Sequence, residues 1–252
     1  MGRETVTRLE LSGVGHAYLG RTVLDEVHLA VGVAEIVALV GPSGCGKSTL
    51  LHIAAGLIDP VRGRVVRDYR RHGVVFQEPR LLPWATARDN IAYALRRRGV
   101  DGLTRKRRVR EVAASVALGE DDLDKYPLEL SGGMAQRVAV ARALAADPDF
   151  VFLDEPFSAL DVGLKRRLQD LTIAALDEGG VSALFVTHDL AEAARIAHRI
   201  VVLDGGGRGV IANRRLPDRP GQRSERQIFE TVQDLLTHDV AFLHINDVGE
   251  RD

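Results

Sequence analysis

A glycine-rich loop between two apolar segments places the strongest constraint on how this chain can fold. The loop reads Gly41-Pro42-Ser43-Gly44-Cys45-Gly46-Lys47-Ser48-Thr49; it follows the apolar run Ile36 to Val40 and precedes Leu50-Leu51. This order predicts a strand, a loop and a helix. Glycines let such a loop turn sharply, so that its backbone N–H groups and the helix N-terminus attract an anion. The stretch therefore predicts a phosphate-binding loop.

Two side chains of this loop carry groups that a nucleoside triphosphate requires. Lys47 supplies an ammonium group for the β- and γ-phosphates, and Ser48 offers a hydroxyl to Mg²⁺. The competing interpretation is a glycine-rich turn before an ordinary helix. That interpretation leaves the positions of the lysine and the hydroxyl unexplained. We therefore expect the chain to bind a nucleoside triphosphate.

Composition limits the remaining possibilities. The 252 residues can form one large domain or two small ones, and the net charge of −1 provides no overall field for nucleic acid. The single cysteine, Cys45, excludes an internal disulfide and fits a reducing cytosol. The sequence shows no hydrophobic signal core at its start and no run of 18 apolar residues. We expect membrane association only through a partner.

Strand-like segments surround the loop. Thr5 to Leu11 alternates between polar and apolar residues, and Val27 to Val31 gives a second strand signal. Tyr18 is expected in a polar link between the first strands, where its ring could stack on a flat base or simply pack. Further on, Asp59-Pro60 and Gly63 predict a turn.

Polar side chains follow three more predicted strands. Asp154 and Glu155 follow the continuous apolar run Phe150 to Leu153, which is typical of a parallel strand buried on both faces. Because ligands bind at the carboxyl ends of such strands, Asp154 suits a Mg²⁺ shell and Glu155 suits polarising an attacking water. Gln77 ends a short strand in the same way. His188 ends another and could contact a γ-phosphate or the lytic water, although strand-end histidines are more often structural.

The middle of the chain, from about Pro79 to Lys125, has helical periodicity. Its basic stretch, Arg96 to Arg110, carries an apolar stripe that includes Val109 and Val112, and it lacks interleaved aromatic residues. This pattern favours a solvated helix face over a nucleic-acid or lipid patch. Before it, the loop Glu78 to Trp84 combines two prolines with three large apolar groups. Those groups either form a partner surface or pack under a neighbouring helix.

A second helix start follows this helical segment. Ser131-Gly132-Gly133 comes after Leu130 and precedes a helix expected from about Met134 to Ala146, with Ser131 as its N-cap. A serine and two glycines at a helix start form a second anion-binding surface. Taken alone the signal is weak, because many helices begin this way.

Together these motifs resemble the ATP-binding subunits of ABC transporters. The resemblance extends from the first strand to about Ala212 and covers Gly41–Thr49, Gln77, Leu130–Gly133 with Gln136-Arg137, Phe150–Glu155, Ser158–Asp161 and His188. It implies an α/β P-loop NTPase fold with a RecA-like core, an antiparallel β subdomain and a helical insert. The implied domains are a core of 1–78 and 147–212, a helical signature subdomain of 79–146, and a tail of 213–252 with an amphipathic helix.

The resemblance also assigns roles. It implies ATP and Mg²⁺ as cofactors and a head-to-tail homodimer that sandwiches two ATP molecules. In that dimer the loop Gly41–Thr49 of one subunit would face Ser131, Gly132 and Gly133 of the other. The remaining roles are adenine stacking by Tyr18, sensing of Mg²⁺ and water by Gln77, membership of Asp161 in the loop that crosses the dimer interface, and a γ-phosphate switch at His188.

The stretch Phe76 to Trp84 narrows the resemblance further, to the ATPases of nitrate, sulfonate and taurine importers. Arg215 to Pro220 resembles the tail of that group, whereas Ala135 departs from the family pattern without touching the chemistry. The implied partners are a multispanning permease and a solute-binding protein, at the cytoplasmic face of the cell membrane. The alternatives are an exporter subunit and, less in keeping with the single short cassette, a soluble non-transport ABC ATPase.

Overall fold

The computed structural model describes residues 6–158, 160–206 and 208–243. Three parts of the predictions therefore lie outside the described residues: Thr5, Ala159 and the end of the 213–252 tail. The chain divides into two compact units, Met1–Tyr69 with Ser182–Asp252 and Arg70–Val181. Each unit carries part of the predicted site, so each is described separately.

An antiparallel sheet forms one half of the first unit. Its strands β1 (Thr7–Tyr18), β2 (Arg21–Gly32) and β4 (Arg62–Arg67) lie in the order β2-β1-β4. Leu19 and Gly20 join β1 to β2 with positive φ angles of 48° and 80°. A two-residue turn of this kind matches the twist of paired strands, so β1 continues up to the turn and β2 begins directly after it. The polar link expected around Tyr18 is therefore wrong, because Tyr18 is the last residue of β1.

The turn predicted at Gly63 is also wrong, because this glycine lies inside β4. It has a φ of 84°, and a Cβ atom there would lie 2.2 Å from the carbonyl oxygen of Gly13 in β1. The pairing of β1 with β4 shifts register between Ser12 and Gly15, at this close approach. The absence of a side chain at Gly63 thus permits a close backbone approach at a bulge between two strands, and the chain does not reverse direction there.

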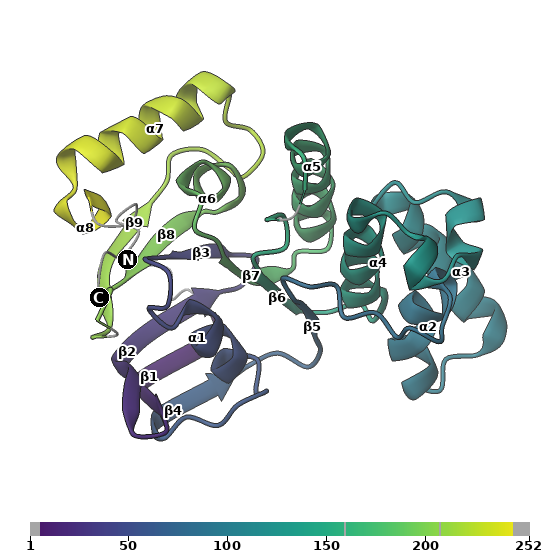
Figure 1. Cartoon of the computed structure of the whole chain (residues 1–252), viewed down its shortest axis with the longest axis horizontal. Coiled ribbons are helices and arrows are strands. Elements are labelled where there is room, and N and C mark those ends of the chain that lie inside the picture. The colour runs from purple at the N-terminus through teal and green to yellow at the C-terminus, as the bar shows by residue number, and fades with distance from the viewer. Residues whose placement is uncertain (1–5, 159, 207, 244–252) are drawn as a thin grey trace. The chain divides into compact units, whose positions relative to one another are not determined.

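Buried parallel strands form the other half of the first unit (Figure 1). The strands β3 (Ile36–Val40), β7 (Ser182–Val186) and β8 (Arg199–Leu203) are buried at every residue. They lie in the order β7-β3-β8, and β9 (Val210–Arg215) pairs antiparallel with β8. Unbroken apolar runs are what strands covered on both faces require. The helix α6 (Leu190–Ile196) packs on β3 and β8.

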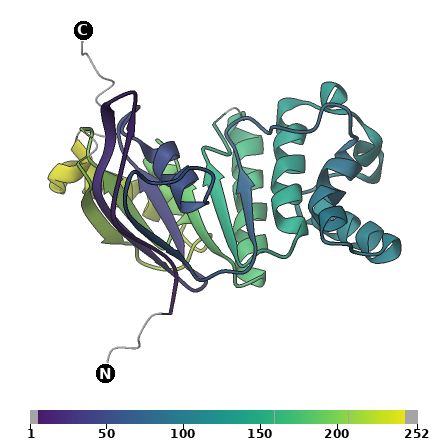
Figure 2. The same cartoon turned by 90° about the horizontal axis from the view of Figure 1, so that it is seen from below.

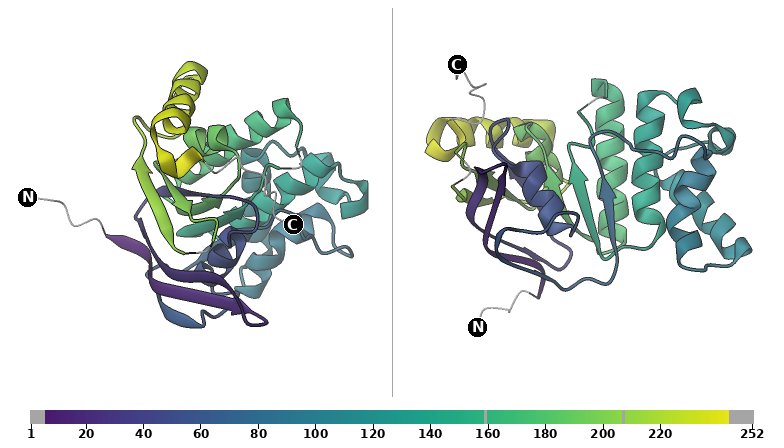
Figure 3. Two further views of the ribbon diagram at one scale, coloured as in Figure 1. Left: turned by 60° about the vertical axis from the view of Figure 1, so that its left-hand side comes forward. Right: turned by 60° about the horizontal axis from the view of Figure 1, so that its bottom comes forward.

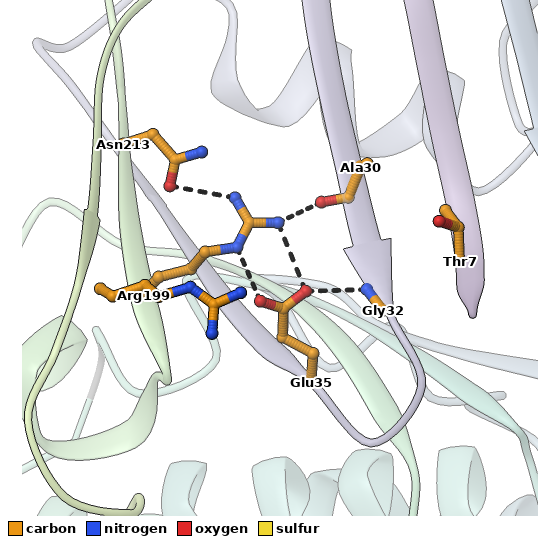
Figure 4. Close-up of a pocket in the computed structure, with 7 residues that line it drawn as sticks. Thr7, Ala30, Gly32, Glu35, Arg199 and Asn213 are labelled. Carbon is orange, nitrogen blue, oxygen red and sulfur yellow. Dashed lines mark hydrogen bonds and ion pairs between the residues drawn. The ribbon is translucent and has the colours of Figure 1, made fainter. Parts of the chain in front are cut away.

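A partly buried ion pair connects these strands to the antiparallel sheet (Figure 4). Arg199 Nε donates to Glu35 Oε1 at 2.7 Å, and Glu35 Oε2 accepts from the Gly32 N–H at 2.7 Å. Arg199 also donates to the carbonyl oxygen of Ala30 and to Asn213 Oδ1. The pair lines a pocket of about 360 Å³. Because Glu35 immediately precedes β3, this network fixes the strand that leads into the glycine-rich loop.

The second unit is mainly helical (Figure 2). Its two strands, β5 (His72–Val75) and β6 (Phe150–Asp154), pair in parallel. The α-helices are α2 (Ala87–Arg97), α3 (Gly102–Ser115), α4 (Gly132–Ala145) and α5 (Val162–Glu178), with short 3-10 helices at Glu120–Asp124 and Pro127–Glu129. Helix α4 is central, since it contacts β5 and the three other α-helices. The helical periodicity expected for this part of the chain is confirmed.

Two helices end the described chain (Figure 3). They are α7 (Glu225–His238) and α8 (Val240–Leu243). Ile228 and Leu235 of α7 are buried, whereas Phe229 is exposed. Helix α7 thus buries two apolar residues of the tail that lie seven positions apart, on one side of the helix. Helix α7 contacts α6, the helix that follows the predicted switch residue His188.

Candidate nucleotide-binding site

The side chain of Lys47 is hydrogen-bonded to the backbone of its own glycine-rich loop. Its side chain is only 7% exposed, and its Nζ donates to the carbonyl oxygens of Gly41 and Pro42, both at 2.8 Å. It is the first residue of α1 (Lys47–Ala54), so the strand β3, the loop and the helix follow one another as predicted. The ammonium group lies on the loop backbone and carries a positive charge to the place where phosphate is expected.

Two glycines shape the loop around this lysine. Gly44 and Gly46 have φ angles of 78° and 97°, which side-chain-bearing residues rarely adopt. A Cβ atom on Gly46 would lie 2.7 Å from Leu24 Cδ2, whereas one on Gly44 would meet nothing within 4 Å. Gly46 is the N-cap of α1, and no side chain caps this helix. The first turn of α1 is therefore arranged to donate its N–H groups to an anion.

Cys45 plays a packing role in this loop. It is 2% exposed, and its Sγ lies 4.0 Å from Lys47 Nζ. Burial raises the pKa of the Cys45 thiol, against the opposing charge of Lys47. A buried thiol with a raised pKa is a poor nucleophile. The sulfur therefore contributes to the loop as an apolar group.

Two further predicted residues belong to the same unit as the loop. Tyr18 is 45% exposed and meets His16 edge-on, with ring centroids 4.7 Å apart. His188 is exposed and is separated from the buried strand β7, which ends at Val186, by Thr187. Its neighbours are ordered, because Thr187 Oγ1 donates to Glu192 Oε2 at 2.6 Å and Asp189 caps α6. The position of His188 is thus set by the helix that follows it.

The two predicted carboxylates end β6 in the second unit. Asp154 is 6% exposed, and Glu155 follows it with a positive φ of 42°. A left-handed conformation in a residue other than glycine is strained, and such strain is concentrated at functional sites. The turn beyond it holds this backbone, since Ser158 Oγ donates to the carbonyl oxygen of Glu155 at 3.0 Å. Ser158 therefore supports the geometry of Glu155.

Gln77 lies just beyond β5 and is exposed. The residue before it is held from α4, because Gln136 Nε2 donates to the carbonyl oxygen of Phe76 at 3.4 Å. Gln136 is 4% exposed. Sequence reasoning placed Gln136 in a family motif but gave it no role. Its signal is a polar residue on the buried side of an otherwise apolar helix.

The second predicted helix start has the expected cap. Ser131 Oγ accepts the Met134 N–H at 3.3 Å at the N-terminus of α4. Ser131 and Gly132 are exposed, while Gly133 is buried against Leu164, whose Cδ2 would lie 2.1 Å from a Cβ atom there. Asp161 caps α5 by accepting the Leu164 N–H at 3.0 Å. Leu164, which the sequence did not single out, thus joins the two motifs.

The loop from Glu78 to Trp84 is fixed by polar contacts that the sequence did not predict. Asn90 is fully buried; it accepts the Leu82 N–H at 2.8 Å and donates to the carbonyl oxygens of Leu82, Ala85 and Thr86. Arg142 of α4 donates to the carbonyl oxygens of Pro79 and Arg80. Trp84 remains 75% exposed. A rigid backbone therefore presents an aromatic side chain to the surroundings.

Two arginines of the basic stretch donate hydrogen bonds to carbonyl oxygens at the C-terminal end of α4. Arg98 Nη1 donates to the carbonyl oxygen of Ala146, and Arg108 Nη2 donates to that of Leu144. Val109 and Val112 are buried beneath the exposed charges of α3. Positive groups at a helix C-terminus are favourable because the last carbonyls lack partners. These contacts favour the interpretation of a structural, solvated helix face.

The predicted site is thus divided between the two units. The first unit contains Tyr18, Gly41–Thr49 and His188, and the second contains Gln77, Ser131–Gly133, Asp154, Glu155 and Asp161. Among residues 6–158, 160–206 and 208–243, no group of three histidine, cysteine or acidic side chains could hold a metal ion by itself. Within the same ranges, no helix has both the length and the apolarity to cross a bilayer.

Comparison with known proteins extends these observations. The family model described as ABC transporter matches residues 24–158. An aliphatic sulfonates import ATP-binding protein of Xanthomonas axonopodis pv. citri is 42% identical over 241 residues, which cover 90% of this chain and 94% of the relative. A taurine import ATP-binding protein of Mesorhizobium japonicum is 47% identical over 190 residues, covering 73% of this chain and 74% of the relative.

Solved structures agree with these relatives. A dimeric ATP-binding cassette in a post-hydrolysis state, bound to ADP and Pi, superposes with a TM-score of 0.75 at 31% identity. The match covers 84% of this chain and all of that one. A second dimeric structure, of a bacterial ABC transporter cassette, gives 0.76 at 32% identity. The α/β P-loop NTPase fold expected from the motifs is confirmed.

Proposed function

Because this chain belongs to the ABC transporter family of ATP-binding subunits, we propose that it hydrolyses ATP to power import of a small solute through a separate membrane permease. The observation that carries the import direction is the match to a sulfonate importer ATPase along 90% of the chain. Taurine and aliphatic sulfonates share an anionic sulfonate group. We propose a solute of that chemical kind.

The loop Gly41–Thr49 binds the phosphates of ATP in this proposal, and its own geometry supports the role. The Lys47 ammonium group lies on the carbonyl oxygens of the loop, and in this proposal it binds the β- and γ-phosphates. Tyr18 stacks on the adenine with its half-exposed ring. Exposed His188 contacts the γ-phosphate. Together these residues bind and orient the nucleotide.

The second unit supplies the groups for hydrolysis. Glu155 polarises the attacking water from its position directly after the carboxyl end of β6. Gln77 and Asp154 of this unit would hold Mg²⁺ together with Ser48 of the glycine-rich loop. Their donor atoms are a hydroxyl, an amide oxygen and a carboxylate, a set that fits a hard cation bound partly by phosphate oxygens. The ion would neutralise charge on the phosphates.

We propose a homodimer that completes each site. Both similar solved cassettes are dimeric. Ser131, Gly132 and Gly133 would face the ATP bound to the loop of the second subunit, with Asp161 in the loop that crosses the interface. The exposure of Ser131 and Gly132 supports this role. One complete set of motifs in the chain favours two identical copies.

The permease is the proposed membrane partner, and the helical segment 79–146 is the part proposed to meet it. Exposed Trp84, on a loop fixed by Asn90 and Arg142, is suited to a docking contact. The core of 1–78 and 147–212 would then bind ATP, and residues 213–252 form the tail. We place the protein at the cytoplasmic face of the membrane, held there by the permease, with a solute-binding protein as a further partner and no role for nucleic acid.

Copurification tests the transport proposal. The protein would be isolated from gently solubilised host membranes and its companions identified by mass spectrometry. A multispanning permease together with a solute-binding protein is the expected result. A permease without a binding protein would favour an exporter. Soluble or nucleic-acid-bound companions without any membrane protein would contradict the transporter proposal and leave the ATPase assignment standing.

The Glu155→Gln variant tests the catalytic assignment. It keeps the size of the side chain and removes its charge, so ATP affinity should stay near the wild-type value while turnover falls by about 10²-fold or more. Turnover and fluorescent-nucleotide binding would be measured on the same preparation. Near-normal turnover would show that Glu155 is not the polarising base.

A further inference from the structure

A buried arginine of the tail lies at the end of the short helix that follows His188. Arg223 is 4% exposed, and its guanidinium donates to four carbonyl oxygens. Two acceptors, Pro217 and Asp218, belong to the tail itself, at 2.6 and 2.8 Å. The other two, Ala194 and Ala197, lie at the C-terminal end of α6, at 2.6 and 2.9 Å. Burying a charge costs stability unless it is well hydrogen-bonded, as it is here.

These contacts fix one end of α6 to the tail. The last carbonyls of a helix have no partners within the helix, so a guanidinium that donates to them both satisfies and orients the helix end. A second contact between α6 and the tail is an ion pair at the surface, in which Arg195 Nη1 of α6 donates to Glu225 Oε1 of α7 at 2.7 Å. That surface pair is expected to contribute little. The buried fork of Arg223 supplies two hydrogen bonds to this helix end, beside one from the Gly221 N–H to the carbonyl oxygen of Arg195 at 3.1 Å.

The other end of α6 fixes the backbone around His188. Asp189 Oδ1 accepts the N–H groups of Ala191 and Glu192 at 2.8 and 3.2 Å. Thr187 Oγ1 donates to Glu192 Oε2 at 2.6 Å and accepts the Asp189 N–H at 3.1 Å. His188 therefore stands between two residues that are both bonded to the first turn of α6. The helix is only seven residues long, so it connects these two ends as one short rigid element.

We propose that Arg223 is a positioning residue for His188, acting through α6. This inference rests on the proposed role of His188 at the γ-phosphate. The guanidinium holds the C-terminal end of α6, the helix holds Glu192 and Asp189, and these hold the residues on both sides of the histidine. The tail is thereby linked to the hydrolysis site rather than being a neutral extension. A change in the tail that moves Arg223 changes how well His188 meets the phosphate.

The test compares Arg223→Ala with a matched control. Arg226→Ala removes an exposed arginine of the same tail, whose ion pair among the described residues is with Glu230 of α7. Because the residues of the glycine-rich loop are untouched, Arg223→Ala should lower kcat for ATP about tenfold while KM stays within about twofold. Arg226→Ala should leave both constants unchanged. Arg223→Lys keeps the charge but loses the planar guanidinium, so its kcat should lie between that of Arg223→Ala and that of the wild type. If Arg223→Ala does not fold, Arg223→Lys replaces it in the test.

A spectroscopic signature separates positioning from general loss of structure. In ¹⁵N-histidine-labelled protein, the imidazole signals of His188 should shift in Arg223→Ala and in Arg223→Lys, while those of His28, on β2, should not. The double variant Arg223→Ala with His188→Ala should lose little more turnover than His188→Ala alone, because both act through one group. Unmoved His188 signals, or additive losses of turnover, would overturn this inference. Wild-type turnover in His188→Ala would instead overturn the proposed role of the histidine.

Discussion

The starts of α1 and α4 were both predicted to bind phosphate, but the protein builds them differently. At α1 the N-cap is Gly46, in a left-handed conformation, and no side chain caps the helix. At α4 the N-cap is Ser131, whose hydroxyl accepts the Met134 N–H. Lys47 at the first start is buried, whereas Ser131 and Gly132 at the second are exposed.

The difference indicates how each start meets its ligand. The start of α1 has N–H groups that are free of a side-chain cap, and Lys47 lies beside them. It can therefore bind a phosphate group without help from a second surface. The second already satisfies one N–H group and carries no charge of its own in its first turn. It is suited to complete a site that another surface has already formed. This is the arrangement expected of an ATP sandwiched between two subunits.

The largest expected effect concerns nucleotide affinity at the first start. Lys47→Ala removes the only cationic side chain of the loop Gly41–Thr49, and with it the charged hydrogen bonds to phosphate. Affinity for ATP should fall by about 10²-fold. A fluorescent-nucleotide titration measures it, with Lys106→Ala on exposed α3 as a control that retains affinity. Unchanged affinity in Lys47→Ala would remove the distinction between the two starts.

The next effect compares one substitution at both starts. Gly46→Ala combines a left-handed backbone with a clash against Leu24 and should destabilise the protein by about 2 to 3 kcal/mol. Gly132→Ala meets nothing within 4 Å in a helical position, so it should be neutral or stabilise by up to about 1 kcal/mol. Urea unfolding of both variants checks this. Equal effects would contradict the described geometry of the loop.

A smaller effect concerns β3, the strand that precedes the glycine-rich loop and the start of α1. Burial by itself would raise the pKa of Glu35, but the hydrogen bonds and charge of Arg199, with the Gly32 N–H, outweigh burial and lower that pKa below 4.5. A carboxyl group whose pKa is lower in the folded state stabilises the fold at pH values above its pKa in the unfolded state. That stabilisation is lost as pH falls through its pKa in the folded state. Wild-type stability should therefore drop below about pH 4.5.

Glu35→Gln tests this pH dependence. It should cost about 2 kcal/mol at pH 7, below the range for a fully buried pair because the carboxylate is partly exposed. The gap between the variant and the wild type should keep its full size down to about pH 4.5 and narrow below it, as pH falls through the lowered pKa of the folded state; urea unfolding at pH values from about 7 down to about 3 measures it. A gap that stays constant would show that the charge of Glu35 does not stabilise the strand.

The smallest effect concerns the cap of the second start. Ser131→Ala should cost about 1 kcal/mol of stability through loss of the hydrogen bond to the Met134 N–H. ATP affinity of the isolated subunit should not change, because the loop Gly41–Thr49 is intact. Thermal unfolding and nucleotide titration give the two values. A large loss of monomer affinity would place Ser131 in the same site as Lys47 within one chain.

The sequence predicted those features whose signal is local. The strand, loop and helix around Gly41–Thr49, the Ser131 cap and the strand before Asp154 each follow from neighbouring residues, and all three are present. Other features depend on partners distant in sequence. Gln136 holds Phe76 from 60 positions away, and Gly63 is required by a close approach to Gly13. Asn90 and Arg223 act on backbone carbonyls, which leave no pattern in the sequence.

The central claim is that two copies of this chain meet across ATP, with the α1 start of one opposite the α4 start of the other. Light scattering of the Glu155→Gln protein, with and without ATP, tests it most directly, because slow hydrolysis preserves the closed state. The account predicts a shift from the 27.5 kDa chain to twice that mass with ATP, and no shift when Lys47→Ala is added. A protein that binds ATP with wild-type affinity yet keeps the mass of one chain would contradict it.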